Sequence, residues 1–140
     1  MDPVIWPKVH GAVVHFPLAL ALASGAADFA AFLLGTRRGA SELHVAGRWM
    51  MIGGALGSVP AVVSGLMLTR GGVLGHGVLR MHHLFAWPAF ALLVALATWR
   101  ACVGATASRW AFAGYLVATA VTAALISAAG FWGGELLIAR

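Results

Sequence analysis

The sequence predicts an all-α fold, an integral membrane bundle of four helices. Of its 140 residues, 61% are hydrophobic and only 9% are charged, whereas a soluble domain carries about 25% charged residues. The apolar residues form four runs, each long enough to cross a hydrocarbon core of about 30 Å. The short connections between these runs favour antiparallel neighbours. We therefore expect residues 1–140 to form a single four-span transmembrane domain, with no separate catalytic domain.

The first span is predicted over residues 10–34. Pro7 precedes it, and Gly35 and the pair Arg37–Arg38 end it. The apolar core of a secretory signal is only about 7–15 residues long, and this run is longer. We therefore expect it to be a span of the mature protein.

The second span is predicted over residues 45–69 and ends before Arg70. Small residues occupy every fourth position of part of this span, at Gly53, Gly57, Ala61 and Gly65. Such a smooth face lets a neighbouring helix or a planar cofactor approach closely. Both interpretations of the small face are open at this point.

The third span is predicted over residues 79–100, after a glycine-rich loop that contains His76. The fourth is predicted over residues 110–133, after Ser108 and Arg109. Because consecutive spans cross in opposite directions, the first and third spans begin at the same membrane surface.

The net charge of +5 comes from Lys and Arg residues that lie mainly near the span ends. Basic residues in this position anchor a helix among lipid head groups, so we expect the bilayer, and no nucleic acid, as the partner. One side collects Lys8, Arg70, Arg80 and Arg140, and the other collects Arg37, Arg38, Arg48, Arg100 and Arg109. The positive-inside tendency favours a cytoplasmic location for the second side and an outside location for both termini.

Five histidines are predicted to lie at one membrane surface, four of them on two spans and His76 in the loop before the third span. His10 and His15 open the first span, and His82 and His83 open the third. Histidines inside a membrane are energetically unfavourable unless they bind something. The spacing of His10 and His15 corresponds to a rotation of about 140°, and that of His82 and His83 to about 100°. The simplest pair therefore takes one histidine from each span.

Two imidazoles that face each other across a bundle suit the axial positions of a low-spin haem b. We expect one haem between the first and third spans, near the outer surface. His15 and His83 are the first-choice ligands, because His15 lies deeper in its span, with His82 and His10 in reserve. The single cysteine excludes a covalently attached c-type haem.

Two charged residues lie near the same surface. Arg80 is a candidate partner for the haem propionates. Glu135 could accept a hydrogen bond from a ligand imidazole, or take a proton at a quinol site, or lie simply at the surface.

Asp28 lies inside the first span, nearer the other surface. An acid within the membrane is a functional candidate. The structural alternative is an ion pair, and Arg37, Arg48 and Arg109 are its predicted partners. His44, on the same side, is expected to be interfacial.

The segment from His10 to Pro17 reads H-G-A-V-V-H-F-P, and further short motifs are Asp28, Ser64-Gly65 and the sequence from Gly133 to Leu136. Together these motifs resemble the DUF2231 family of small four-span bacterial membrane proteins, whose opening motif is H-P-x-x-V-H-F-P. Gly11 replaces the usual proline of that motif. The resemblance implies a bacterial cytoplasmic membrane. It also implies redox work, because some members are fused to Rieske or cytochrome modules.

The chain is therefore expected to be a b-type cytochrome-like electron-transfer subunit. It would relay electrons between a redox protein partner and a quinone or a second partner, as a non-catalytic part of a larger oxidoreductase. One alternative is a transition-metal site or transporter that uses the same histidines. Another is a cofactor-free membrane anchor. The sequence contains no nucleophile–base arrangement and no phosphate loop, so a self-contained hydrolase or kinase is not expected.

Overall fold

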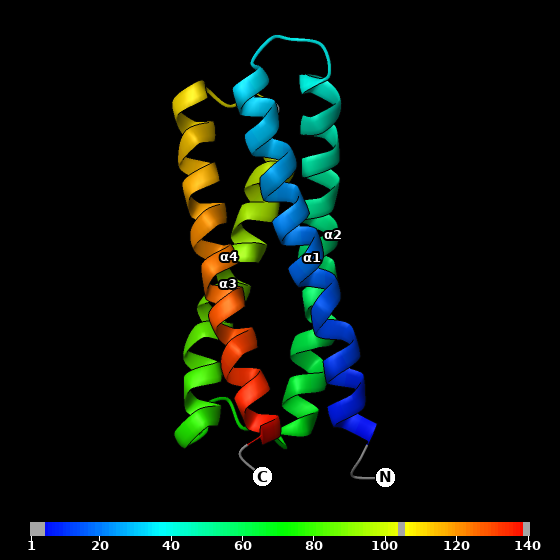
Figure 1. The fold of residues 1–140 in the computed structure, drawn as a ribbon, viewed down its shortest axis with the longest axis vertical. Helices are drawn as coiled ribbons and strands as arrows, with labels where there is room; N and C mark the ends of the chain where they lie inside the picture. The colour runs from blue at the N-terminus through cyan, green and yellow to red at the C-terminus, as the bar shows by residue number, and fades with distance from the viewer. Residues whose placement is uncertain (1–4, 104–105, 139–140) are drawn as a thin grey trace.

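The computed structural model describes residues 5–103 and 106–138. Figure 1 shows the helices α1 (Ile5–Leu34), α2 (Ala40–Leu68), α3 (Gly77–Cys102) and α4 (Arg109–Ile138), which form an antiparallel bundle. Each helix is long and apolar enough to cross a membrane. The predicted all-α, four-span architecture is confirmed.

The first two helices begin five residues before the predicted spans. In α1 the extra turn includes Pro7, which lies where a helix has no need of a backbone donor, so the ring is tolerated there. We call the end of the bundle at which α1 and α3 begin the terminal face, and the end at which α2 and α4 begin the opposite face. The terminal face is at the bottom of Figure 1.

The helices are arranged as a ring in which α1 packs mainly on α2 and α3 mainly on α4. The small residues of α2 lie against α1. A Cβ atom added to Gly57 would lie 2.6 Å from the Phe16 ring, and one added to Gly65 would lie 3.1 Å from the His10 ring. The small face therefore serves the packing of α1 on α2. Because α1 packs on α2 and α4, and α3 packs on the same two helices, α1 and α3 lie diagonally across the ring.

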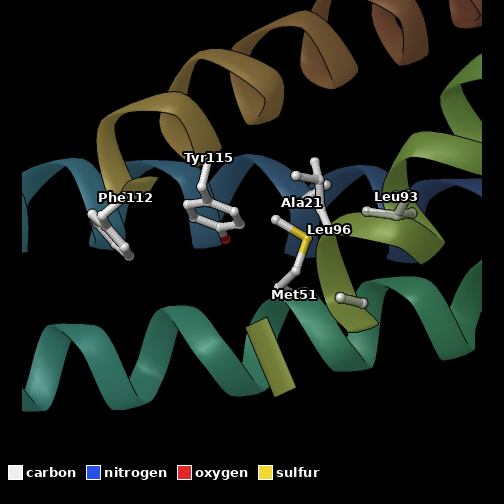
Figure 2. Close-up of a cluster of buried hydrophobic side chains, with 7 residues drawn as sticks. Ala21, Met51, Leu93, Leu96, Phe112 and Tyr115 are labelled. Carbon is white, nitrogen blue, oxygen red and sulfur yellow. The ribbon is translucent and has the colours of Figure 1, made fainter. Parts of the chain in front are cut away.

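The core lies nearer the opposite face and takes side chains from every helix. Figure 2 shows Ala21 of α1, Met51 of α2, Leu93 of α3 and Tyr115 of α4 converging on one another. Met51 and Leu93 are almost fully buried. Close side-chain packing of this kind is what holds transmembrane helices together, because lipid is as apolar as the side chains.

Candidate functional site

His10 projects from the second turn of α1 toward α2. Its Nδ1 lies 3.1 Å from the Ala61 carbonyl oxygen and 3.1 Å from the Ser64 hydroxyl, and that hydroxyl itself donates to the Ala61 carbonyl. Because a carbonyl oxygen only accepts, Nδ1 carries the proton, and the lone pair of a neutral ring is on Nε2. Gly65 leaves the space that the ring occupies.

His82 is held in the same way by α4. Its Nδ1–H donates to the Ala129 carbonyl oxygen at 2.8 Å, so its Nε2 also carries the lone pair. A Cβ atom on Gly133 would lie 3.3 Å from this ring. Within residues 5–103 and 106–138, neither the Nε2 of His10 nor that of His82 has a hydrogen-bond partner.

The two rings lie close together across the α1–α3 diagonal. Their centroids are 6.5 Å apart and their planes are nearly perpendicular, at 82°. Each histidine is the sixth residue of its helix, so both lie at a similar depth below the terminal face. An imidazole that donates Nδ1–H to a carbonyl while its other nitrogen is free has the arrangement of a metal-ligating histidine.

His83 has the other tautomer. Its Nδ1 accepts a hydrogen bond from the Gly75 N–H at 3.3 Å, so the proton of its neutral ring is on Nε2. The indole N–H of Trp87 donates to the Val73 carbonyl at 2.7 Å. His83 and Trp87 together hold the connection between α2 and α3 against α3, and His83 has no free ring lone pair.

His15 and His83, the pair that the sequence favoured as ligands, do not face each other as His10 and His82 do. His15 is exposed, and its Nδ1–H donates to the Gly11 carbonyl of its own helix at 2.6 Å. No ring contact of His15 is found in the described part of the chain. His83 is buried beside His82, with ring centroids 5.7 Å apart.

The remaining candidates at this face are Arg80 and Glu135. Arg80 is exposed, two residues before His82, and Glu135 is half-buried on α4. The group that orients His82 is the Ala129 carbonyl, where the sequence had suggested the Glu135 carboxylate. Among the described residues, no three His, Cys, Asp or Glu side chains are grouped so that they could hold a metal ion.

A second polar cluster lies near the opposite face. The Asp28 side chain is fully buried and accepts hydrogen bonds from Arg100, at 2.5 Å to Oδ1 and 3.3 Å to Oδ2. The Tyr115 hydroxyl donates to Oδ2 at 2.9 Å. The predicted partners Arg37, Arg48 and Arg109 were therefore wrong, although the expected ion pair exists. Asp28 faces the bundle interior, and Arg100 of α3 is the arginine that also points there.

The second helix completes this cluster. Arg100 also donates to the His44 carbonyl oxygen at 2.9 Å, and the same guanidinium nitrogen lies 3.3 Å from the Nδ1 of His44. His44, which was expected only to lie at the membrane interface, is therefore part of the cluster. Gly47 is required beside Asp28, because a Cβ atom there would collide with the carboxylate. Groups from all four helices thus meet at Asp28, and its charge is paired and hydrogen-bonded, as a buried charge must be.

Sequence reasoning missed Arg100 and Tyr115 in this cluster. One signal was available, since Arg100 is the last residue of the predicted third span and Asp28 lies within the first. Charges at membrane depth pair with one another. Tyr115, the chain's one tyrosine, carried no comparable signal.

The motif residues that suggested a family lie at these two clusters. Ser64 and Gly65 contact His10, Gly133 contacts His82, and Asp28 is the centre of the ion pair. A family model described as "Predicted membrane protein (DUF2231)" matches residues 7–139. No curated protein and no solved structure matches the chain. The chain belongs to the DUF2231 family of predicted membrane proteins.

Proposed function

We propose that the chain is a b-type cytochrome-like membrane subunit, in which His10 and His82 hold one haem b near the terminal face. The observation that carries this proposal is the geometry of the pair, with ring centroids 6.5 Å apart. A histidine nitrogen binds a metal at about 2.0 Å, so two rings on opposite sides of one metal have centroids about 6 Å apart. The separation of the two rings fits that requirement.

The number of ligands favours haem over a bare metal ion. A porphyrin supplies four nitrogens to iron and leaves two axial positions for the protein. Copper, zinc or nickel bound by side chains alone needs about three or four of them. The described residues offer a pair of imidazoles and no group of three.

The neighbouring residues have supporting roles in this proposal. The Ala61 and Ala129 carbonyls fix the tautomer of each histidine, which keeps both Nε2 atoms available as ligands. Arg80, exposed at a similar depth, would pair with propionates. A bound haem b would supply reversible one-electron chemistry, and electrons would pass to or from a redox protein or a quinone.

The same proposal includes a location. We place the chain in a bacterial cytoplasmic membrane, with the terminal face outside. The subunit itself would be non-catalytic and would work within a larger oxidoreductase.

Visible spectroscopy tests the proposal directly. The protein, purified in detergent from a haem-replete host, should show sharp reduced α and β bands after dithionite, with one haem per chain by pyridine haemochrome. H10A and H82A should each abolish these bands. H15A is the matched control and should keep them, because His15 is exposed and bonded to its own helix.

A featureless spectrum from correctly folded protein would overturn the proposal. Stoichiometric copper, zinc or nickel in that sample would then favour the metal-site alternative. Absence of both haem and metal, with H10A and H82A altering stability alone, would favour a cofactor-free anchor.

A further inference from the structure

A lateral groove of about 240 Å³ separates α1 from α4 at hydrocarbon depth. Its floor includes Ala21 and Thr119, which are buried, and its rim includes Leu22, Phe29 and Ala120, which are exposed. Gly25 lies at the floor, where an added Cβ atom would be 3.1 Å from the Thr119 methyl group. The groove therefore exists because small residues line a seam at which the helices meet loosely, and it opens toward lipid.

A cation lies at the end of this seam. The Arg109 guanidinium is 4.9 Å from the centroid of the Phe32 ring, so the first residue of α4 reaches across to α1 at the opposite face. Leu116, Ala120 and Ala123 follow Arg109 by seven, eleven and fourteen residues. These spacings put all four on one face of the helix. Arg109 and the groove are parts of one continuous surface.

We propose that this surface binds one anionic phospholipid, with the phosphate at Arg109 and an acyl chain in the groove. Arginine and the positive end of a helix dipole both favour a phosphate, and Arg109 is at the N-terminus of α4. Trp110, the next residue, is 86% exposed, as is typical of a side chain at head-group level.

The dimensions agree with a single lipid. From Arg109 to Ala123 the helix rises about 21 Å, which is close to half the thickness of about 40–45 Å of a bilayer with its head groups. An acyl chain whose phosphate lies at Arg109 therefore extends about as far as Ala123, along the length of the groove. A neutral isoprenoid quinone would use the groove and leave Arg109 without a role, and we take this as the competing occupant.

Native mass spectrometry with added lipids tests the assignment. The detergent-purified protein is incubated with phosphatidylglycerol or with phosphatidylcholine of identical chains, and retained lipid is counted. We expect one phosphatidylglycerol per chain, retained about fivefold better than phosphatidylcholine. R109Q should lower phosphatidylglycerol retention to the phosphatidylcholine level, and R109K should restore most of it. R38Q is the control, with the same charge change at the same face.

A substitution that fills the groove tests the acyl-chain contact separately from the phosphate contact at Arg109. A26L places a larger side chain in the groove and should reduce retention of both lipids, whereas A23L, at an exposed alanine of the same helix outside the groove, should not. Equal losses in R109Q and R38Q, equal effects of A26L and A23L, or co-purification of a quinone in place of a phospholipid would each overturn the proposal. None of these outcomes depends on haem.

Discussion

Asp28 is a buried charge, and burying a charge is unfavourable unless it is paired and hydrogen-bonded. Its carboxylate is fully buried and receives hydrogen bonds from Arg100 and Tyr115. Two charges taken out of water need each other, because removal of one leaves the other unpaired in a medium of low dielectric constant. The cluster therefore holds the four helices together, and its members should contribute unequally to the free energy of unfolding.

We expect D28N to lower the free energy of unfolding by about 3–5 kcal/mol, since it leaves the Arg100 guanidinium uncompensated. Y115F removes one hydrogen bond to a charged group and should cost about 1.5–3 kcal/mol. E42Q, at an exposed carboxylate, is the control and should change stability by less than about 0.5 kcal/mol. Unfolding in detergent, followed by circular dichroism, measures all three. A D28L/R100M double variant less stable than D28N would contradict this interpretation of the pair.

His82 and His83 are neighbours with opposite tautomers, which makes their roles separable. In H83A the proposed haem spectrum should persist, while the connection between α2 and α3 loses the bond from the Gly75 N–H. Hydrogen exchange in residues 73–76 should therefore accelerate. H82A should abolish the spectrum and leave that exchange unchanged. The opposite assignment of the two effects would show that His83 is the ligand.

At the scale of the helix, α2 contains two glycines whose environments differ sharply. An added Cβ atom at Gly57 meets the edge of the Phe16 ring, which is 58% exposed and free to move. An added Cβ atom at Gly47 meets the Asp28 carboxylate, which cannot move without breaking its hydrogen bonds. The sequence presents both simply as glycines in an apolar helix.

G47A should therefore destabilise the protein by about 1–3 kcal/mol, as overpacking does. G57A should be nearly neutral, because Phe16 can turn away and alanine gains up to about 1 kcal/mol of helix propensity. G114A, where a Cβ atom has no neighbour within 4 Å, is the control and should be neutral or stabilising. The midpoint of thermal unfolding, measured for the three variants in one detergent, gives the order of their stabilities. Equal losses at Gly47 and Gly57 would refute the argument.

The helices themselves could be predicted from the sequence, because long apolar runs leave few alternatives in lipid. Their exact starts could not, since Pro7 is compatible with a first turn as well as with a preceding loop. Spacing indicated one histidine from each of two helices, but the rotation of each helix decides which one faces inward. That rotation depends on partners such as Ala61 and Ala129, which are ordinary residues in the sequence. The partner of Asp28 was hidden for the same reason.

At the scale of the whole molecule, the two polar clusters lie toward opposite membrane surfaces. His10 and Asp28 are 18 positions apart on α1, which corresponds to about 27 Å along the helix. The histidine pair, with its free nitrogens, is toward the terminal face, and the closed ion pair is toward the opposite face. Under the proposed function, a partner that exchanges electrons with the histidine pair would therefore approach from the terminal side.

The orientation of the bundle decides on which side of the membrane that partner would be found. Chemical labelling of the chain's cysteine can determine this orientation. Cys102 is the one cysteine, is exposed, and ends α3 at the opposite face. If the opposite face is cytoplasmic, a membrane-impermeant maleimide should label Cys102 only after the cells are permeabilised. C102A/H76C moves the thiol to an exposed position in the connection at the terminal face and should be labelled in intact cells. The reverse pattern would place the terminal face, and with it the proposed electron exchange, in the cytoplasm.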